Sequence, residues 1–284
     1  MGPLQPSEPS SATHLRLLFI HHSCGGELLA SPGPPVGENC IRMTSPNGGG
    51  LRSRLEQEGY SVHEASYGSV VGEKTDIFDW LPKFRDRMER VLSCDSQDAV
   101  YLVSQRNDIV VFKSCFPNNE FTGPGQPPGD ATGPELTVWN AKAAYSGLLE
   151  EFRKYPQTLF VCVTAPPLAP NPEPLWKRLA RWVLRRPNRL PASGVLAREF
   201  NNWLSGADGW LKEYSLTNVA VFDLFDLLTD FGQSNLSRYP TCGGRDSHPS
   251  REGNAKAANA FVPFLNKVVH QWEPRRGRRD KVPT

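Results

Sequence analysis

Short apolar runs alternate along the chain with segments whose apolar residues recur at helical spacing. Five of the runs are short enough for buried strands, and each is bounded by polar, glycine or proline residues. They span residues 15–20, 61–65, 108–112, 158–163 and 218–222. An uninterrupted run such as DIVVF at 108–112 is typical of a strand that is covered on both faces of a parallel sheet.

Helical patterns lie between and after these runs. One follows a triple glycine over residues 51–59, a second covers 82–92, and a third ends near Arg153. The last runs from about 251 to 270, with Ser250 as its N-cap. Five buried strands separated by helices predict an α/β fold: a three-layer α/β/α sandwich around a mainly parallel five-stranded sheet.

Residues capable of chemistry follow the predicted strands. The first strand leads into HHSCGG, the second into SYG and the third into KSCFPNN, and DSHP directly precedes the last helix. These segments contribute His22, Ser23, Gly68, Asn118, Asn119, Asp246 and His248. We expect these residues to meet at one rim, because ligands bind beyond the carboxyl ends of the strands in such sheets.

This set contains the groups that acyl transfer requires. Ser23 is the candidate nucleophile, His248 the base that deprotonates it, and Asp246 the carboxylate that fixes the tautomer of the imidazole. Each has a structural alternative. A serine after a strand commonly belongs to a turn, and the DSHPS run supplies good caps for the start of a helix.

In the order of these blocks, the sequence resembles the SGNH (GDSL-type) hydrolase family from Leu15 to about His270. HHSCGG stands where the family usually has GDS, SYG stands for the second block, and SCFPNN stands in place of GxND. DSHP forms the last block, with one residue between Asp246 and His248 where many members have two. The resemblance implies a flavodoxin-like fold and the hydrolysis of acyl esters of small molecules, lipids or sugars without a metal.

The resemblance also implies an oxyanion hole. Its donors would be the backbone N–H groups of Ser23 and Gly68 and the side-chain amide of Asn118, with Asn119 as the alternative. Asn119 and His22 would line the substrate pocket, His22 in the place where the family usually carries an aspartate. Gly68 could instead serve a turn with positive φ, and the two asparagines could belong to ordinary turns.

Two other groupings are rejected on geometry. The Asn-Asp pair at 107–108 looks like part of the third family block, but it precedes the third strand and belongs to the opposite edge of the sheet. His21 and His22 with Asp246 and His248 would form a metal-ligand set, but adjacent residues at a strand end point to opposite faces. We therefore expect no metal and no other cofactor.

Charge is unevenly distributed along the 284 residues, although the net charge is only +2. Residues 176–189 hold six Lys and Arg without an acid, and the tail at 273–284 holds five with two acids. The rest of the chain is therefore acidic. Such a body does not fit a nucleic-acid binder with one broad positive face, and we expect no nucleic-acid partner.

No apolar run approaches the roughly 18–20 residues of a membrane span. Residues 1–14 are rich in Pro and Ser and lack an apolar core, so they predict a disordered leader rather than a signal peptide. The six cysteines are scattered without CxxC spacing, as in a reduced cytoplasmic protein. We expect a cytoplasmic location and one hydrolase-like domain over 15–272, followed by the basic tail at 273–284.

A basic insertion at about 174–191 follows the fourth strand. Leu175, Leu179, Trp182 and Val183 recur at helical spacing, basic residues fill much of the other side, and prolines bracket the segment. This pattern predicts a cationic amphipathic helix of about three turns. One hypothesis makes it a lid or a contact with anionic substrate or a membrane surface. The other makes it a surface helix packed by its Trp face.

The residues and the resemblance together predict a serine ester hydrolase with an acyl-enzyme on Ser23. Its substrates would be small carboxylic esters or O-acetylated carbohydrate. Two other functions stay open. One is an acyltransferase that uses the same triad with a sugar or alcohol acceptor, and the other is a non-catalytic glycan-binding relative.

Overall fold

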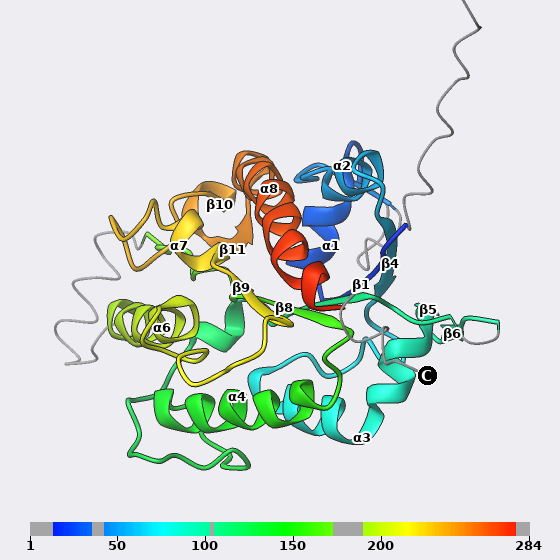
Figure 1. The fold of residues 1–284 in the computed structure, drawn as a ribbon. Helices are drawn as coiled ribbons and strands as arrows, with labels where there is room; N and C mark the ends of the chain where they lie inside the picture. The colour runs from blue at the N-terminus through cyan, green and yellow to red at the C-terminus, as the bar shows by residue number, and fades with distance from the viewer. Residues whose placement is uncertain (1–13, 36–42, 103–104, 173–189, 277–284) are drawn as a thin grey trace, which may run out of the picture.

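A computed structural model of the chain assembles all five predicted strands into one sheet (Figure 1). The structure describes residues 14–35, 43–102, 105–172 and 190–276. The strands are β1 Arg16–Ile20, β4 Ser61–Ala65, β7 Ile109–Lys113, β8 Leu159–Val163 and β9 Val219–Phe222. Their spatial order is β4-β1-β7-β8-β9, and every neighbouring pair is parallel. The predicted fold class is confirmed.

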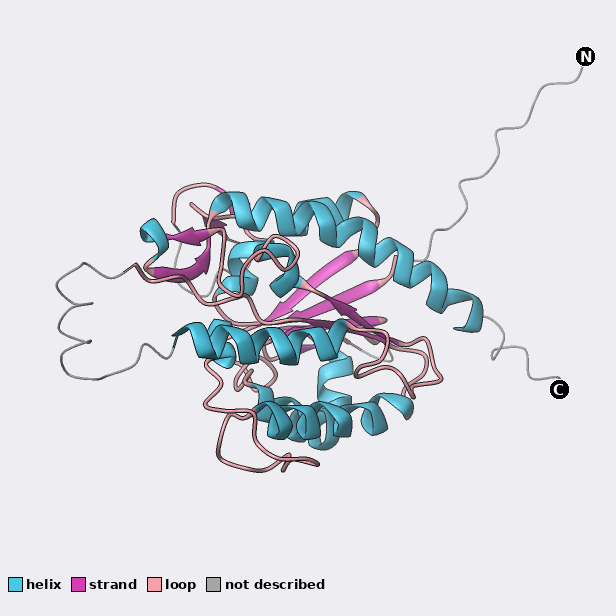
Figure 2. Cartoon of the chain, turned by 90° about the vertical axis from the view of Figure 1, so that its left-hand side faces the viewer, coloured by secondary structure: helices cyan, strands magenta, loops and turns pink. Residues whose placement is uncertain are grey.

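Helices cover both faces of this sheet, as Figures 1 and 2 show. One face carries α1 Cys24–Leu29, α2 Leu51–Gln57 and α8 Arg251–Arg276, and the other carries α3 Trp80–Ser93, α4 Val138–Arg153 and α6 Leu190–Ser205. Successive residues of β1 enter opposite cores: Leu17 and Phe19 pack under α1, α2 and α8, and Leu18 and Ile20 pack over α3, α4 and α6. Both faces of the sheet are buried under helices, which explains why the apolar runs of the strands are uninterrupted.

Short elements connect these layers. Three two-stranded pairs form within the described residues. One is parallel, between β2 Ser31–Pro32 and β3 Thr44–Ser45. The other two are antiparallel, between β5 Cys94–Ser96 and β6 Ala99–Val100 and between β10 Pro240–Thr241 and β11 Asp246–Pro249. Short turns of helix in the described part of the chain are η1 Ile77–Asp79, η2 Phe116–Asn119, α7 Leu224–Leu228 and η3 Cys242–Gly244.

The segment after Ser23 is one for which the sequence patterns above predict no helix. It is the helix α1, although two glycines have low helix propensity. Packing explains the difference, because Gly25 lies so close to its neighbours that an added Cβ would meet His21 Cβ at 2.4 Å and Lys113 Cε at 3.1 Å. The glycine lets the helix approach the end of the sheet rather than giving the backbone freedom.

The helix α6 is not predicted by the sequence patterns above. Its buried residues Ala197, Phe200 and Leu204 recur at helical spacing, which is the signal that could have identified it. Most of the predicted basic helix at 174–191 lies outside the described residues, and its last two positions, Leu190 and Pro191, begin α6.

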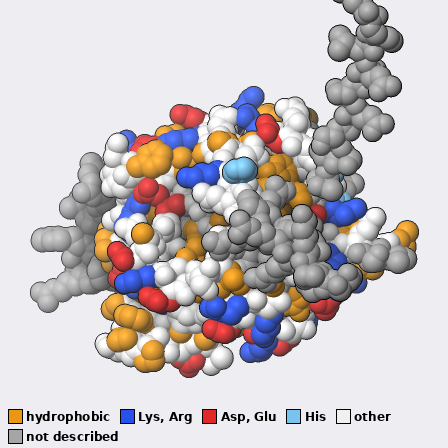
Figure 3. Space-filling view, in the orientation of Figure 1, with side chains coloured by type: hydrophobic (Ala, Val, Ile, Leu, Met, Phe, Trp, Pro, Cys, Tyr) orange, Lys and Arg blue, Asp and Glu red, His pale blue; other side chains and the backbone are white. Residues whose placement is uncertain are grey.

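The last helix, α8, begins where the sequence predicts. The Gly253 N–H donates to Ser250 Oγ at 3.3 Å, so Ser250 caps the helix. The helix extends beyond the predicted end to Arg276. No helix in the described part of the chain is long and apolar enough to cross a membrane. On the face seen in Figure 3, basic and acidic side chains are interspersed.

Candidate active site

Ser23 lies at the turn between β1 and α1. Its backbone has φ 39° and ψ −97°, an unusual conformation for a residue with a side chain. Strained residues persist where the surrounding structure holds them, and they concentrate at functional sites. Here the buried strand on one side and the packed glycine helix on the other hold the turn, so Ser23 Oγ is presented at the carboxyl end of the sheet.

Asp246 and His248 lie on the short strand β11, immediately before α8. Side chains two residues apart on a strand point to the same face, so the single residue between them brings carboxylate and imidazole together. His248 Nδ1–H donates to Asp246 Oδ1 at 2.7 Å, and the His248 backbone N–H donates to the same oxygen at 3.0 Å. The intervening Ser247 accepts a hydrogen bond from the Ala169 N–H at 2.8 Å, which anchors β11 to the segment after β8.

His248 links Ser23 to Asp246 in a chain of two hydrogen bonds, which we call the relay. Ser23 Oγ–H donates to His248 Nε2, across 225 residues of sequence. The Phe116 ring packs against the imidazole in a T-shaped arrangement, with the ring centroids 5.1 Å apart. The side chain of His248 is 28% exposed, so the relay is open to solvent on one side. The predicted Ser/His/Asp group is therefore brought together within hydrogen-bonding reach.

The charge on Asp246 is favoured by its partners. Partial burial acts to raise the pKa of Asp246, but the hydrogen bonds from His248 outweigh it and hold this pKa below its usual value. The carboxylate is therefore ionised at neutral pH. An ionised Asp246 keeps the proton of the neutral imidazole on Nδ1, which leaves Nε2 free to accept the proton of Ser23.

The two histidines before Ser23 take different partners. His22 Nε2–H donates to the Gly72 carbonyl at 2.7 Å and its ring stacks on Tyr67, with centroids 3.7 Å apart. Burial lowers the pKa of His22, so the ring is neutral at pH 7. His21 is buried and bonds Glu64 at 2.9 Å instead. Among the described residues, no group of three or more His, Cys, Asp or Glu side chains is arranged to hold a metal ion.

Gly68 follows β4 with φ 80°, a conformation that favours glycine. Its backbone N–H, the predicted oxyanion donor, donates to Glu73 Oε1 at 2.6 Å. Residues next to Gly68 contact the serine loop through His22. Tyr67 stacks on the His22 ring, and the Gly72 carbonyl accepts the hydrogen bond from His22 Nε2. In this structure a carboxylate oxygen therefore occupies the position next to the amide.

The two candidate asparagines lie in η2, which follows β7. Asn118 Nδ2 donates to Asp76 Oδ1 at 2.8 Å, and Asn118 Oδ1 accepts the Ile77 N–H at 2.8 Å. Asn119 is 1% exposed, and its Nδ2 donates to the carbonyls of residues 165 and 166. Both amides thus hold neighbouring loops in this structure.

Sequence reasoning missed Glu27, which lies on α1 one turn after Ser23. Its backbone N–H donates to the Ser23 carbonyl at 3.1 Å. Burial raises the pKa of Glu27, and the nearby His248 acts in the opposite direction. Glu27 therefore adds a second carboxyl group, besides Asp246, close to the imidazole. No motif marks it, because it belongs to a helix that the sequence does not predict.

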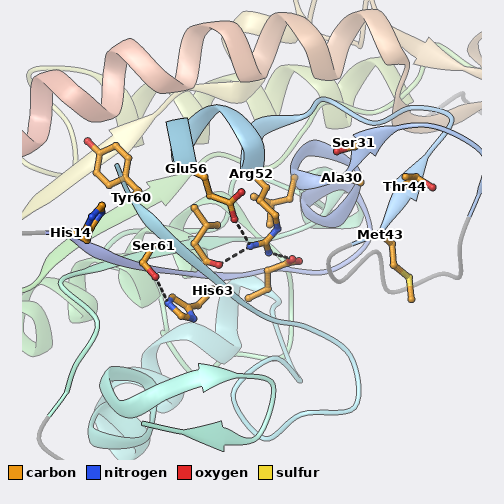
Figure 4. A pocket seen from close by; sticks show the side chains of 13 residues that line it. His14, Ala30, Ser31, Met43, Thr44, Arg52, Glu56, Tyr60, Ser61 and His63 are labelled. Carbon is orange, nitrogen blue, oxygen red and sulfur yellow. Dashed lines mark hydrogen bonds and ion pairs between the residues drawn. The ribbon is translucent and has the colours of Figure 1, made fainter. Parts of the chain in front are cut away.

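A cavity of about 790 Å³ lies elsewhere, along the edge strand β4 (Figure 4). Ser61 and His63 line it and belong to a second Ser/His/Asp grouping: Ser61 Oγ is 2.9 Å from His63 Nε2, and His63 Nδ1 is 2.8 Å from Oδ1 of Asp95, which lies outside the lining. The Ser61 amide is bonded to the Leu15 carbonyl within the edge pairing, so this serine has no amide to offer to an oxyanion. Ion pairs from Arg52 to Glu56 and Glu64 form another part of the wall, as Figure 4 shows.

No protein-family model and no curated protein matches the chain. Solved structures do. A carbohydrate esterase family 2 enzyme with a carbohydrate binding domain, from Corynascus thermopiles (Myceliophthora fergusii), is 15% identical, with a TM-score of 0.44 over 94% of this chain and 69% of that chain. An acetyl xylan esterase from the rumen bacterium Butyrivibrio proteoclasticus is 16% identical, with a TM-score of 0.45 over 93% of this chain and 66% of that one.

Proposed function

We propose that this chain is a serine hydrolase that cleaves small carboxylic esters or O-acetylated carbohydrate. The observation that carries the proposal is the continuous relay from Ser23 Oγ through His248 to Asp246, held at the carboxyl end of a parallel sheet. A hydrogen-bonded nucleophile, base and orienter is the arrangement that activates a serine hydroxyl.

In the proposed mechanism, His248 Nε2 takes the Ser23 proton as Oγ attacks the ester carbonyl. Asp246 stabilises the imidazolium that forms, because its carboxylate accepts the Nδ1–H. His248 then returns the proton to the leaving alcohol, and an acyl group remains on Ser23. Water activated by the same imidazole releases the acid and restores the serine.

The oxyanion would be held by the Ser23 and Gly68 amides and the Asn118 side chain. Each such donor typically contributes about 3–4 kcal/mol to stabilisation of the transition state. The donors of Gly68 and Asn118 bond Glu73 and Asp76 in this structure, so substrate must replace these two carboxylates as partners. His22 and Asn119 are proposed to line and support the pocket beside them.

The test is hydrolysis of nitrophenyl esters of graded chain length, alongside acetylated sugars, by the full chain and by Ser23→Ala. We expect Ser23→Ala to fold normally and to lose at least about 10³-fold in kcat. Ser53→Ala, an exposed serine on α2, is the matched control and should keep full activity. A fluorophosphonate should label the peptide that contains Ser23. Turnover retained in Ser23→Ala would contradict the proposal.

A further inference from the structure

Two thiols lie side by side next to the candidate nucleophile. The Sγ atoms of Cys24 and Cys115 are 3.5 Å apart and share a hydrogen bond, although the residues are 91 positions apart in sequence. Cys24 directly follows Ser23 as the first residue of α1, and Cys115 directly precedes η2. The pair therefore joins the loop after β1 to the loop after β7.

The two thiols have unlike surroundings. Cys24 is 2% exposed, and burial raises its pKa well above the usual value. The pKa of Cys115 lies well below its usual value, because the hydrogen bond from Cys24 stabilises its thiolate and the charge of Lys113 adds to this effect. Lys113 is itself 1% exposed, so its charge acts from within the protein. Cys115 is also the more exposed of the two thiols.

We propose that Cys24 and Cys115 form a reversible disulfide when the protein meets a peroxide, and that this bond switches off hydrolysis at Ser23. The second half of the proposal rests on the function proposed above. A partly exposed thiolate beside a buried thiol is the arrangement of an attacking and a resolving cysteine. Lys113 would be a positioning residue that favours the thiolate.

The chemistry balances with hydrogen peroxide as the oxidant. The Cys115 thiolate attacks one peroxide oxygen, the O–O bond breaks, and the second oxygen leaves as water after taking a proton. The Cys24 sulfur then attacks the resulting sulfenic acid: the S–S bond forms, the S–O bond breaks, and a second water leaves with the Cys24 proton. Two thiols are oxidised and one peroxide is reduced. A dithiol reverses the change by exchange.

The bond would disturb both partners of the serine–histidine hydrogen bond. The sulfur atoms must approach from 3.5 Å to about 2.05 Å, the length of a disulfide. Cys24 is covalently joined to Ser23, and Cys115 to Phe116, whose ring lies against His248. Closing the pair therefore shifts nucleophile and base relative to each other. A displacement of about 1 Å in such a site costs as much as about 10²-fold in rate.

The test treats the reduced full chain with stoichiometric hydrogen peroxide, alkylates the remaining thiols and maps peptides without reduction. We expect a linked Cys24–Cys115 peptide pair, lighter than the two free peptides by two hydrogens. Hydrolysis of a nitrophenyl acetate should fall by at least about tenfold and return with dithiothreitol. Cys115→Ser and, independently, Cys24→Ala should form no such pair and resist peroxide. Cys242→Ser, which changes an exposed thiol, should respond like the unmodified protein.

Three results would overturn the proposal. They are a peptide map without the pair, a pair whose formation leaves hydrolysis unchanged, and equal inactivation of the Cys115→Ser or Cys24→Ala variant. If the reduced protein hydrolyses no ester, the function proposed above fails. The thiol pair is then judged by the peptide map alone, so the two failures remain distinguishable.

Discussion

The Gly68 backbone N–H donates to the carboxylate of Glu73 at 2.6 Å, and Glu73 is exposed. The amide proposed to bind a negatively charged oxygen thus already binds one in the absence of substrate. This shows that the turn presents the N–H to an anion. It also means that substrate must displace Glu73, at the cost of a hydrogen bond to a charged group, about 1.5–3 kcal/mol.

Glu73→Ala should therefore raise kcat/KM for nitrophenyl esters. Removing the competing carboxylate frees the Gly68 amide, and we expect an increase of at least about tenfold, with little change in the free energy of unfolding. Glu135→Ala, which removes another exposed carboxylate on a different loop, is the control for the general change in charge. If Glu73→Ala leaves kcat/KM unchanged, Gly68 is not an oxyanion donor.

Asp246→Asn should lower kcat by about 10²–10⁴-fold, while substrate binding changes little. An asparagine amide can donate to Nδ1, which favours the tautomer with the proton on Nε2 and removes the acceptor for the Ser23 proton. The measurement is kcat and KM for both proteins, with a thermal melt to check folding. Asp208→Asn, at a side chain that is 94% exposed, is the control. A kcat within twofold of the parent would remove Asp246 from the relay.

The sheet and the rim could be predicted because they depend on local patterns. Apolar runs identify strands that are buried on both faces, and parallel strands bring their following loops to one edge. The single residue between Asp246 and His248 places both side chains on one face of the strand that carries them. This arrangement can be predicted from sequence, because side chains two residues apart on a strand share a face whatever the rest of the fold is.

Other features depend on contacts that no local pattern contains. The helix after Ser23 forms against glycine propensity, because Gly25 packs closely on His21. The carboxylate of Glu73 reaches Gly68 only through the fold of the intervening loop, and Cys24 meets Cys115 only because β1 and β7 are neighbours in the sheet. Side-chain partners set by three-dimensional packing are the part that the sequence does not encode locally.

The two asparagines of η2 should respond differently to truncation. Asn118→Ala should lower kcat by about 10²-fold if its amide turns to the oxyanion. Asn119→Ala should instead lower the free energy of unfolding by about 2–3 kcal/mol, because it leaves the buried carbonyls of residues 165 and 166 without their donor. Urea denaturation and ester kinetics on both variants separate the roles. The opposite pattern, with kcat lost in Asn119→Ala at unchanged stability, would make Asn119 the donor.

Lys83 links pH to the stability of the loop that carries Glu73. Its ammonium group donates to the backbone carbonyls of Val71 and Glu73. Lys83 is only 6% exposed. Burial lowers the pKa of Lys83 to about 8. The unfolded chain keeps a lysine pKa near 10.4, so between these values the unfolded state binds more protons and stability from this group rises with pH.

Lys83→Met should remove this dependence. Between pH 7 and 9.5, the free energy of unfolding of the parent should rise by about 2 kcal/mol relative to Lys83→Met. The rise is expected because the buried ammonium group of Lys83 loses its proton in this range, which removes an unfavourable buried charge from the folded state. Comparing the two proteins at each pH cancels the thiols and tyrosines that titrate in both. Lys212→Met, at a side chain that is 54% exposed, should keep a constant difference from the parent. Urea denaturation across this range is the measurement, and a pH-independent difference for Lys83→Met would show that Lys83 keeps an ordinary pKa in the folded protein.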